Sequence, residues 1–538
     1  MAETPTLPGE NELSELLGSP YRVDPSDPDT IPKFVDRLPI PQVLESSNQI
    51  NERRYYEIEM KQAKHKLHKY FPYTTLWGYN GMYPGPTIET MRDQSIMVKW
   101  INNLPKKHFL PVDRTLHGTV DTPEVRTVVH LHGANVSPDS DGHPEAWFTK
   151  NYEEQGSHFS NKIYKYTNHQ QAATLWYHDH ALGITRLNVY AGLAGFYIIR
   201  DHLEPRLKLP AGEYEVPLMI QDKSFNKDGS LFYPSEPANP VPGVFPSIVP
   251  VFFGNTILVN GKVWPYHPVE PRKYRFRLVN GSNSRTYTLS LSTGQSFYQI
   301  GTDGGLLGKP VEIQTLTIAP AERADIIIDF SAFTGQNILL KNADTNLHTS
   351  QVMQFRVVLP LKGKDTSKIP DVLYPVEHMN EALVSKVRNL TLSGTTDMYN
   401  RPMLLLDEKM WHDPVTEKPE LDTIEIWNFV NLTPFAHPVH VHLVQFQILC
   451  RQPFDVEHYN QTGEIIYTGD PVEPSENEMG WKDTVRAGGG QVTSIIAHFN
   501  HHAGDYVWHC HILEHEDHDM MRPIKVIGDS CSHGSHGA

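Results

Sequence analysis

Cysteine is scarce in this chain, which has three cysteines among its 538 residues: Cys450, Cys510 and Cys531. Three cysteines cannot build the disulfide framework that holds many small secreted proteins together. Long apolar stretches are missing as well, because none approaches the roughly 20 uninterrupted apolar residues of a membrane-spanning helix. We therefore expect a protein that does not cross a membrane and in which each cysteine has an individual role.

Positive charge is also in deficit, since 47 lysines and arginines face 63 aspartates and glutamates, a formal net charge of −16 at pH 7. A nucleic acid or an anionic membrane would be repelled by this excess, so neither is an expected partner. The first residues, MAETPTLPGENELSELLG, lack the basic and apolar regions of a secretory signal. We expect synthesis in the cytoplasm without a signal peptide.

Turn-forming residues are abundant, with 42 prolines and 36 glycines. Between the turns, segments such as 95–103, 274–281 and 324–330 either alternate apolar and polar residues or form short apolar runs. Asn-Gly turns such as the one in LVNGKVWP (258–265) are typical of hairpins, and helical periodicity is rare. These patterns predict an all-β fold of sandwiches or barrels in series.

Two polar, proline-containing breaks divide the chain, at residues 198–210 and 360–375. We expect three domains with a linker between the second and third: 1–201, 202–362, the linker 363–386, and 387–538. The first domain includes an N-terminal extension. About 35 residues at the start and the last eleven, GDSCSHGSHGA, are expected to be flexible ends.

Histidine is plentiful, with 29 residues, and four His-x-His pairs lie in the first and third domains. On a strand, residues i and i+2 project from the same face, so each pair presents two imidazoles side by side. Imidazole is the commonest metal ligand near neutral pH. Eight such nitrogens suit a cluster of three metal ions at the interface of the two domains. The pairs are His130 and His132, His178 and His180, His440 and His442, and His509 and His511.

The segment HCHILEHEDHDMM (509–521) carries a second set of ligands. Cys510 points away from the histidines on either side of it, so it serves a different centre on the other face of the strand. A thiolate, the imidazole of His515, a weak thioether from Met520 and a second imidazole from His437 match a blue-copper electron-transfer site. An electron that reaches Cys510 is one peptide link away from the histidine cluster.

The remaining histidines and cysteines have simpler interpretations. Isolated histidines such as His117, His143 and His412 are interpreted as surface or hydrogen-bonded structural residues, and Cys450 as a core residue. Zinc binding is an alternative for any single His-x-His pair, although a structural zinc site requires four protein ligands. The tail residues Cys531, His533 and His536 are assigned to the flexible end.

Several longer motifs carry a resemblance over nearly the whole chain, from about residue 30 to 527. They are WGYNGMYPGPTIE, VVHLHG, SDGHPEAWF, LWYHDHALGITRLNVYAGLAGFYII, ILVNGKVWPY, HPVHVHLVQFQIL and YVWHCHILEHEDHDMMRP. With these motifs the sequence resembles the multicopper oxidases, and within them the bacterial spore-coat laccases that also oxidise bilirubin. The resemblance implies three cupredoxin-like Greek-key domains, the third holding a type 1 copper and the first and third sharing a trinuclear cluster.

Carried over by position, the resemblance implies four copper ions. The type 1 ligands are His437, Cys510, His515 and Met520; the type 2 ligands are His130 and His440; the type 3 pair takes His132, His178, His180, His442, His509 and His511. Glu516 and Asp141 are the expected proton relays. The alternative interpretation is that both are exposed carboxylates that contribute only to solubility. Asp179, between two cluster histidines, is expected to point away and to hydrogen-bond a neighbouring group.

The resemblance implies a laccase, or a bilirubin oxidase, that oxidises small aromatic reductants and reduces O2 to water. It also implies a monomer in a spore coat. A cuprous or ferrous metallo-oxidase is the enzymatic alternative. The acidic segment 473–483 is compatible with a metal-docking loop, whereas the 14 methionines are dispersed, which counts against a cuprous oxidase. A structural coat component with cross-linking oxidase activity is the third possibility, and no repeat supports a purely structural role.

Overall fold

The computed structural model describes residues 23–528. Expectations about residues 1–22 and about the tail, including Cys531, His533 and His536, lie outside the described residues. Strands make up 42% and helices 8% of the structure, which confirms the all-β prediction. None of the described helices is long and apolar enough to span a membrane.

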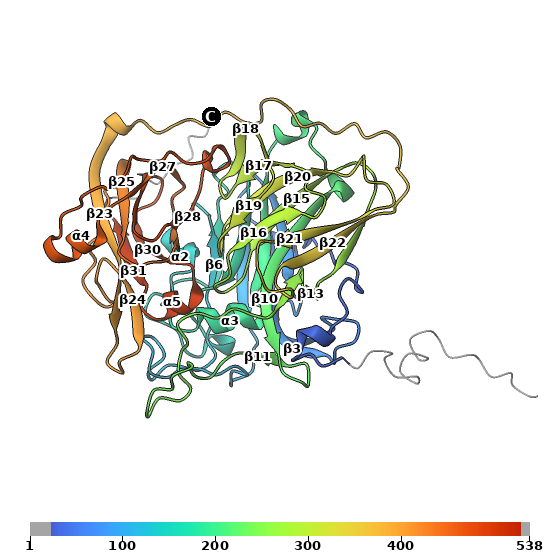
Figure 1. The fold of residues 1–538 in the computed structure, drawn as a ribbon. Coiled ribbons are helices and arrows are strands. Elements are labelled where there is room, and N and C mark those ends of the chain that lie inside the picture. The colour runs from blue at the N-terminus through green and yellow to red at the C-terminus, as the bar shows by residue number, and fades with distance from the viewer. Residues whose placement is uncertain (1–22, 529–538) are drawn as a thin grey trace, which may run out of the picture.

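The sheets form three units, each of two sheets, that follow one another along the chain (Figure 1). One sheet of the first unit joins β1 (Asn48–Ile50), β2 (Arg53–His65), β3 (Thr74–Tyr79), β5 (Ile96–Asn102) and β7 (Ile163–Tyr166). The other joins β4 (Gly85–Met91), β6 (Val129–His132), β8 (Thr174–Asp179) and β9 (Ala194–Arg200). Helices of this part are η1 (Pro28–Thr30), α2 (Pro138–Asp141), η2 (Lys150–Tyr152), α3 (Thr185–Ala191) and η3 (Glu204–Leu207).

The second unit has a large and a small sheet. The large one contains β10 (Glu215–Phe225), β11 (Leu231–Phe232), β12 (Thr256–Val259), β13 (Lys262–Val263), β15 (Lys273–Asn280), β17 (Phe297–Thr302), β18 (Gly305–Ile313) and β20 (Arg323–Asp329). The small one contains β14 (Tyr266–Val269), β16 (Tyr287–Leu291), β19 (Leu316–Ile318), β21 (Asn337–Asn342) and β22 (Gln351–Val357). The helix η4 (Gly212–Tyr214) precedes β10. Asn260 and Gly261 connect β12 to β13 with positive φ angles of 48° and 77°, as the expected Asn-Gly hairpin turn requires.

The third unit begins after an irregular stretch, residues 358–380, that crosses the molecule from the second unit (Figure 1). Its sheets are β23 (Val384–Thr396), β24 (Pro402–Leu406), β25 (Thr423–Asn431), β27 (Phe446–Pro453) and β29 (Gln491–Phe499), and β26 (His437–Val441), β28 (Thr484–Ala487), β30 (Gly504–Cys510) and β31 (Met521–Val526). Its helices are η5 (Glu381–Leu383), α4 (Val456–Thr462), η6 (Glu476–Glu478) and α5 (Leu513–Asp517). The domain boundaries expected from the sequence stay a prediction.

Strand alternation explains how these sheets bury their cores. In β5 the residues IMVKWIN alternate between buried and half-buried positions, as the sequence pattern predicts. In the third unit Phe429 of β25 stacks on Trp508 of β30, with ring centroids 5.7 Å apart, and this contact joins the two sheets of the unit. The third unit therefore has a core of its own.

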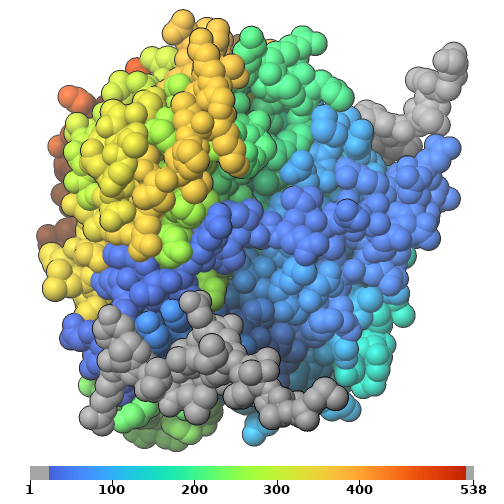
Figure 2. Space-filling model, turned by 90° about the vertical axis from the view of Figure 1, so that its right-hand side faces the viewer, coloured from blue at the N-terminus to red at the C-terminus, as the bar shows by residue number. Residues whose placement is uncertain are grey.

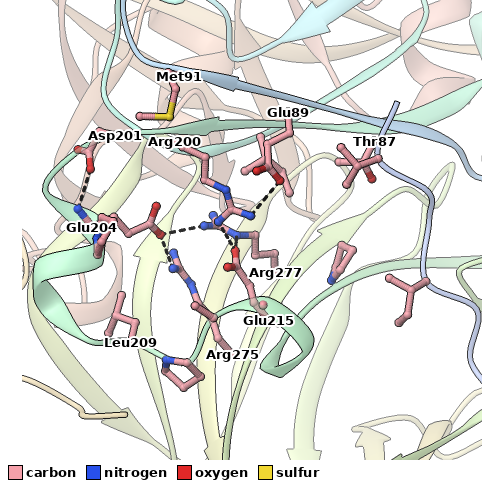
Figure 3. A pocket seen from close by; sticks show the side chains of 18 of the residues that line it. Thr87, Glu89, Met91, Arg200, Asp201, Glu204, Leu209, Glu215, Arg275 and Arg277 are labelled. Carbon is pink, nitrogen blue, oxygen red and sulfur yellow. Dashed lines mark hydrogen bonds and ion pairs between the residues drawn. The ribbon is translucent and has the colours of Figure 1, made fainter. Parts of the chain in front are cut away.

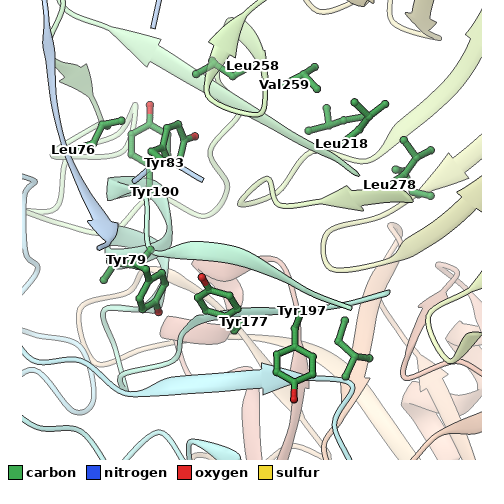
Figure 4. Packing of buried hydrophobic residues seen from close by; sticks show 14 of the residues in the cluster. Leu76, Tyr79, Tyr83, Tyr177, Tyr190, Tyr197, Leu218, Leu258, Val259 and Leu278 are labelled. Atoms are coloured by element: carbon green, nitrogen blue, oxygen red, sulfur yellow. The ribbon is translucent and has the colours of Figure 1, made fainter. Parts of the chain in front are cut away.

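The first and second units share one continuous core (Figure 4). Tyrosines of the first unit, such as Tyr79 and Tyr177 with ring centroids 4.8 Å apart, belong to the same buried cluster as Leu218 and Leu278 of the second. The phenol of Tyr83 donates a hydrogen bond to the Gln221 side chain across the boundary at 2.7 Å. This shared core fixes the two units relative to each other.

A network of buried and half-buried arginines and carboxylates also joins these two units, along a cavity of about 720 Å³ (Figure 3). Arg200 pairs with Glu89 at 3.0 Å, and Arg277 pairs with Glu204 at 2.9 Å. Arg275 donates to Asp325 through Nε at 2.9 Å. Since each of these arginines has a carboxylate partner, the network serves cohesion between the units.

The N-terminal segment corrects one expectation. Residues 23–35, expected to be flexible, are part of the ordered fold, and the chain that follows lies across the second unit (Figure 2). The amide of Phe34 donates to the carbonyl of Trp264 at 2.9 Å, and Leu38 is buried. These backbone and apolar contacts are formed with residues more than 200 positions away, which no local pattern reveals.

Candidate metal centres between the first and third units

Two pairs of neighbouring strands, with the residues that directly follow three of them, position the eight histidines of the His-x-His pairs, which we call the histidine cluster. In the first unit, His130 of β6 lies opposite His178 of β8. In the third unit, His440 of β26 lies opposite His509 of β30, and Val439 lies opposite Cys510. The alternation of faces along β30 therefore places Cys510 and the two histidines beside it on opposite sides of the sheet.

The first and third units meet at the histidine cluster, and a helix contact holds them together. The carboxylate of Asp517 in α5 accepts hydrogen bonds from the amides of Thr185 and Arg186 at the start of α3, each at 2.9 Å. It also pairs with the guanidinium of Arg186 at 2.9 Å. Figure 1 shows α3 and α5 side by side.

The histidine cluster divides into three groups in which the ligand atoms lie within 4.8 Å of one another. The groups are His130, His132 and His440; His132, His178 and His511; and His180, His442 and His509. All eight residues are at most 1% exposed. The structure thus brings together every histidine that the sequence assigns to the cluster.

The hydrogen-bond partners of these imidazoles indicate which ring nitrogens are free to bind a metal ion. Nδ1 of His130 faces the carbonyl of Asp141 at 2.7 Å, and Nδ1 of His440 faces the carbonyl of Asp483 at 2.7 Å. Each Nδ1 must then carry the proton, which leaves both Nε2 atoms as bare acceptors. These two Nε2 atoms lie 3.4 Å apart, and two facing lone pairs at that distance call for a cation between them.

The group of His180, His442 and His509 has the same arrangement. Nδ1 of His442 lies 2.7 Å from a carboxylate oxygen of Asp141, and Glu516 lies 2.9 Å from Nδ1 of His180 and 3.0 Å from Nδ1 of His509. The Nε2 atom of His442 lies 3.2 Å from that of His180 and 3.3 Å from that of His509. The carboxylates orient the rings so that three lone pairs converge.

The third group has unpartnered nitrogen atoms. His178 points Nδ1 at the carbonyl of Asp179 at 2.8 Å, and its buried Nε2 has no hydrogen-bond partner. His132 uses Nε2 toward Asp483 and Thr484 and leaves Nδ1 without a partner, and both ring nitrogens of His511 are unpartnered. Buried polar atoms without partners are costly in a folded protein unless an ion satisfies them. The residues therefore fit a group of bound metal ions.

Burial keeps these imidazoles in the neutral form that binds metals. It lowers the pKa of His178 to about 3, and it holds the pKa values of His130 and His440 well below the ordinary value. Nearby imidazoles lower these pKa values further, since two cations cannot be accommodated side by side.

On the other face of β30 lies a second group, which we call the cysteine site: His437, Cys510, His515 and Met520. Sγ of Cys510 lies 3.5 Å from Nδ1 of His437 and 3.7 Å from Nδ1 of His515. Met520 is fully buried, and its carbonyl accepts from the amide of Cys510 at 3.1 Å. Burial raises the pKa of the Cys510 thiol and lowers that of His437 to about 4, so a thiolate here needs a bound cation.

The two carboxylates singled out from the sequence are buried, which corrects the notion that they are exposed. Asp141 is 0% and Glu516 is 1% exposed, and both contact histidines of the cluster. Burial raises the pKa of Asp141 well above its usual value. Asp179 points away from the cluster, as expected, and accepts from the side-chain amide of Asn188 at 2.7 Å.

Asp483 is a residue of the site that the sequence interpretation missed. Its carboxylate lies 3.0 Å from Nε2 of His132 and 2.8 Å from Nη1 of Arg323, a residue of the second unit. Its carbonyl orients His440. The sequence signal was the short segment GWKDT, which was interpreted only as part of an acidic loop.

That acidic loop, residues 473–483, has part of its charge already paired within the protein, and its role as a metal-docking loop stays a hypothesis. Glu478 pairs with Arg451 and with Arg486, each at 2.9 Å, and is nearly buried. Asp483 lies against the histidine cluster and not against the cysteine site. A second correction concerns Cys450, which is half-buried and not a core residue.

Comparisons with known proteins place this geometry in one family. Family models described as "Multicopper oxidase" match residues 59–122 and 121–204, 243–355, and 384–529. A laccase of Bacillus subtilis is 55% identical, covering 92% of this chain and 99% of the relative. A laccase of the archaeon Haloferax volcanii is 38% identical, covering 92% of this chain and 86% of the relative.

Among solved structures, a laccase from Pediococcus acidilactici superimposes with a TM-score of 0.75 at 28% sequence identity, covering 93% of this chain and 95% of that one. The match extends across all three two-sheet units. The expectation of three cupredoxin-like domains in series is thereby confirmed.

Proposed function

The chain belongs to the multicopper oxidase family and to its laccase class, and from that premise we propose how it works and on which donors. It oxidises phenols, aromatic amines or bilirubin-like tetrapyrroles one electron at a time and reduces O2 to water. The observation that carries this proposal is the position of Cys510. Its side chain lies in the cysteine site, while the residues on either side of it belong to the histidine cluster.

The proposed ligand sets follow the groups of buried donors. A type 1 copper takes the cysteine site, and a type 2 copper takes His130 and His440. One type 3 copper takes His132, His178 and His511, and the other takes His180, His442 and His509. When bound, the four copper ions supply one-electron oxidation of the donor and four-electron reduction of O2 to two waters.

The chain's own residues separate the two half-reactions. Among the four residues of the cysteine site only His515 keeps exposed surface, 5%, so a donor can approach the edge of that ring without reaching a metal ion. Phe435, which is 46% exposed, lies beside it with ring centroids 6.2 Å apart and offers an aromatic surface to an aromatic donor. The backbone of β30 then provides a covalent path to His509 and His511.

Protons for water formation are supplied by Asp141 and Glu516. Both carboxylates are buried against Nδ1 atoms of cluster histidines, where each can pass on a proton and orient a ring. Despite its burial, the imidazoles of His509 and His180 hold the pKa of Glu516 well below its usual value, so this carboxylate stays ionised between proton transfers. Burial favours the protonated form of Asp141, as required of a group that releases a proton during turnover.

The location and assembly of the enzyme are proposed from its resemblance to the bacterial spore-coat laccases. We expect a monomer, since a single chain brings all the donor groups together, and a place in the spore coat. The natural donor is one of the aromatic classes named above. A structural coat component that cross-links its neighbours remains the second candidate, because oxidised phenols couple to one another.

Oxygen uptake by the copper-loaded enzyme with a methoxyphenol and with bilirubin tests the proposal. We expect uptake with both donors, an absorption band of a blue-copper site, and loss of both in Cys510→Ser. The matched control, Cys450→Ser, changes a half-buried cysteine outside both centres and should retain both. A blue Cys510→Ser protein would show that the type 1 ligands are assigned wrongly.

A further inference from the structure

The loop that leads into the cysteine site contains a hydrogen-bond network that the mechanism described so far does not use. It runs from Asn431, the last residue of β25, through Thr433 to His437, the first residue of β26. Asn431 and His437 are fully buried, and Thr433 is 6% exposed. Buried polar side chains are almost always hydrogen-bonded, so the partners of these three residues decide how each is oriented.

The side chain of Asn431 fixes the loop. Its amide nitrogen donates to the carbonyl of Phe435 at 2.9 Å and to the carbonyl of Ala487 in β28 at 3.0 Å. Its amide oxygen accepts from the backbone amide of Thr433 at 2.9 Å and from the Thr433 hydroxyl at 2.8 Å. Because a carbonyl oxygen can only accept, these contacts determine which way the amide group points. Asn431 thus ties the end of β25 to the sheet that contains His437.

The hydroxyl of Thr433 has three polar neighbours and one proton to donate. The neighbours are Oδ1 of Asn431 at 2.8 Å, the carbonyl oxygen of Phe435 at 3.1 Å and Nε2 of His437 at 2.9 Å. The first two are acceptors only, so the hydroxyl proton points to one of them. Of the three neighbours, only Nε2 of His437 is able to donate. It therefore carries a proton, which the hydroxyl oxygen of Thr433 accepts.

This hydrogen bond selects the tautomer of His437. With the proton on Nε2, the Nδ1 atom keeps its lone pair, and Nδ1 is the atom that lies 3.5 Å from Sγ of Cys510. A metal ion needs a ring nitrogen without a proton. A hydrogen bond from the other ring nitrogen orients the ring and makes the imidazole a more basic ligand. Thr433 therefore acts on the cysteine site through His437 without belonging to it.

We propose that Thr433 is a positioning residue of the type 1 copper site, which sets the tautomer of His437 and lowers the reduction potential of the bound ion. This role rests on the proposed function, because it takes the cysteine site to hold that copper. A more basic imidazole donates more charge to the ion and stabilises the cupric over the cuprous form. Loss of the hydroxyl should therefore raise the potential and weaken the binding of Cu(II).

The test compares three single variants of the copper-loaded enzyme. Thr433→Val keeps the branched shape and removes the hydroxyl, whereas Thr433→Ser keeps the hydroxyl. Alanine is unsuitable, because Thr433 borders a cavity of about 680 Å³ from which a water molecule would replace the lost group. The matched control is Thr493→Val in β29. This threonine is also buried, and its hydroxyl has no hydrogen-bond partner, so the exchange removes no such contact.

Each variant is titrated with redox mediators while the blue absorption is followed, and its affinity for Cu(II) is measured by competition with a chelator. We expect Thr433→Val to bind Cu(II) at the cysteine site about 10- to 100-fold more weakly, the usual effect of losing a group that orients a ligand. At unchanged Cu(I) affinity, each tenfold loss raises the potential by about 59 mV. Thr433→Ser and Thr493→Val should match the parent enzyme.

Equal potentials in Thr433→Val and the parent enzyme would overturn the proposal, even if the variant were less stable, because Thr433 would then have a structural role only. An equal rise in Thr493→Val would overturn it too, since the change would reflect packing in the third unit. The same holds for a Thr433→Ser enzyme that shifts as far as Thr433→Val, because the methyl group would then be responsible. A parent enzyme without blue absorption would contradict the proposed copper site itself, and the role of Thr433 with it.

Discussion

The contact between Arg323 and Asp483 offers a quantitative test of how the middle unit supports a centre to which it contributes no ligand. Arg323 lies in β20, is 1% exposed, and donates from Nη1 to Asp483 at 2.8 Å. It also donates to the carbonyls of Thr174 and Ala321, each at 3.0 Å. Asp483 in turn contacts His132 through its carboxylate. Replacing Arg323 by methionine therefore leaves a buried carboxylate without its cation.

Removing one partner of a buried ion pair costs about 3–5 kcal/mol, because the remaining charge stays desolvated. The free energy of unfolding of the copper-free protein should fall by that amount in Arg323→Met. The carboxylate would also lose the contact that orients it toward His132, and loss of such support typically costs about 10- to 100-fold in metal affinity or activity. The cysteine site lies on the other face of β30 and should keep its blue absorption.

The assay combines denaturant unfolding, copper content and oxygen uptake. The matched control is Arg388→Met, which breaks a buried pair with Glu425 at 2.6 Å in the third unit, away from both centres. We expect both variants to lose stability, but only Arg323→Met to lose copper from the histidine cluster and oxygen reduction. If the two variants retained the same activity and copper content, the inference that the second unit orients the cluster would be refuted.

Three further predictions concern the centres themselves. Glu516→Gln should slow oxygen reduction about 10²- to 10⁴-fold while the blue site stays intact, because the amide cannot pass on a proton; unchanged turnover would remove Glu516 from the relay. Asp141→Asn should slow the same step and keep the ring of His442 in place, whereas a blue site lost in this variant would indicate a structural role. Met520→Leu should raise the potential measured in a redox titration, and an unchanged potential would point to another axial group.

The acidic segment 473–483 illustrates what a run of charge in the sequence leaves undecided. Its carboxylates suggest a docking loop when only the sequence is considered, since charge runs are usually exposed to solvent. In the structure Glu478 is neutralised by Arg451 and Arg486, and Lys482 pairs with Asp303 at 2.9 Å. Whether a charge is available to a ligand depends on its partners, and these come from other units.

The sequence by itself determined the all-β fold, the residues of the histidine cluster and the cysteine site, and their division between two faces of one strand. Side chains alternate between the two faces of a strand, which is a local property of the backbone, and this alternation places Cys510 on the face opposite to His509 and His511. Only the tertiary structure decided which nitrogen atoms converge, that Asp141 and Glu516 are buried, and that Arg323 supports Asp483 from 160 positions away. Such contacts depend on how separate units pack, and packing is set by surfaces that residues distant in the chain build together.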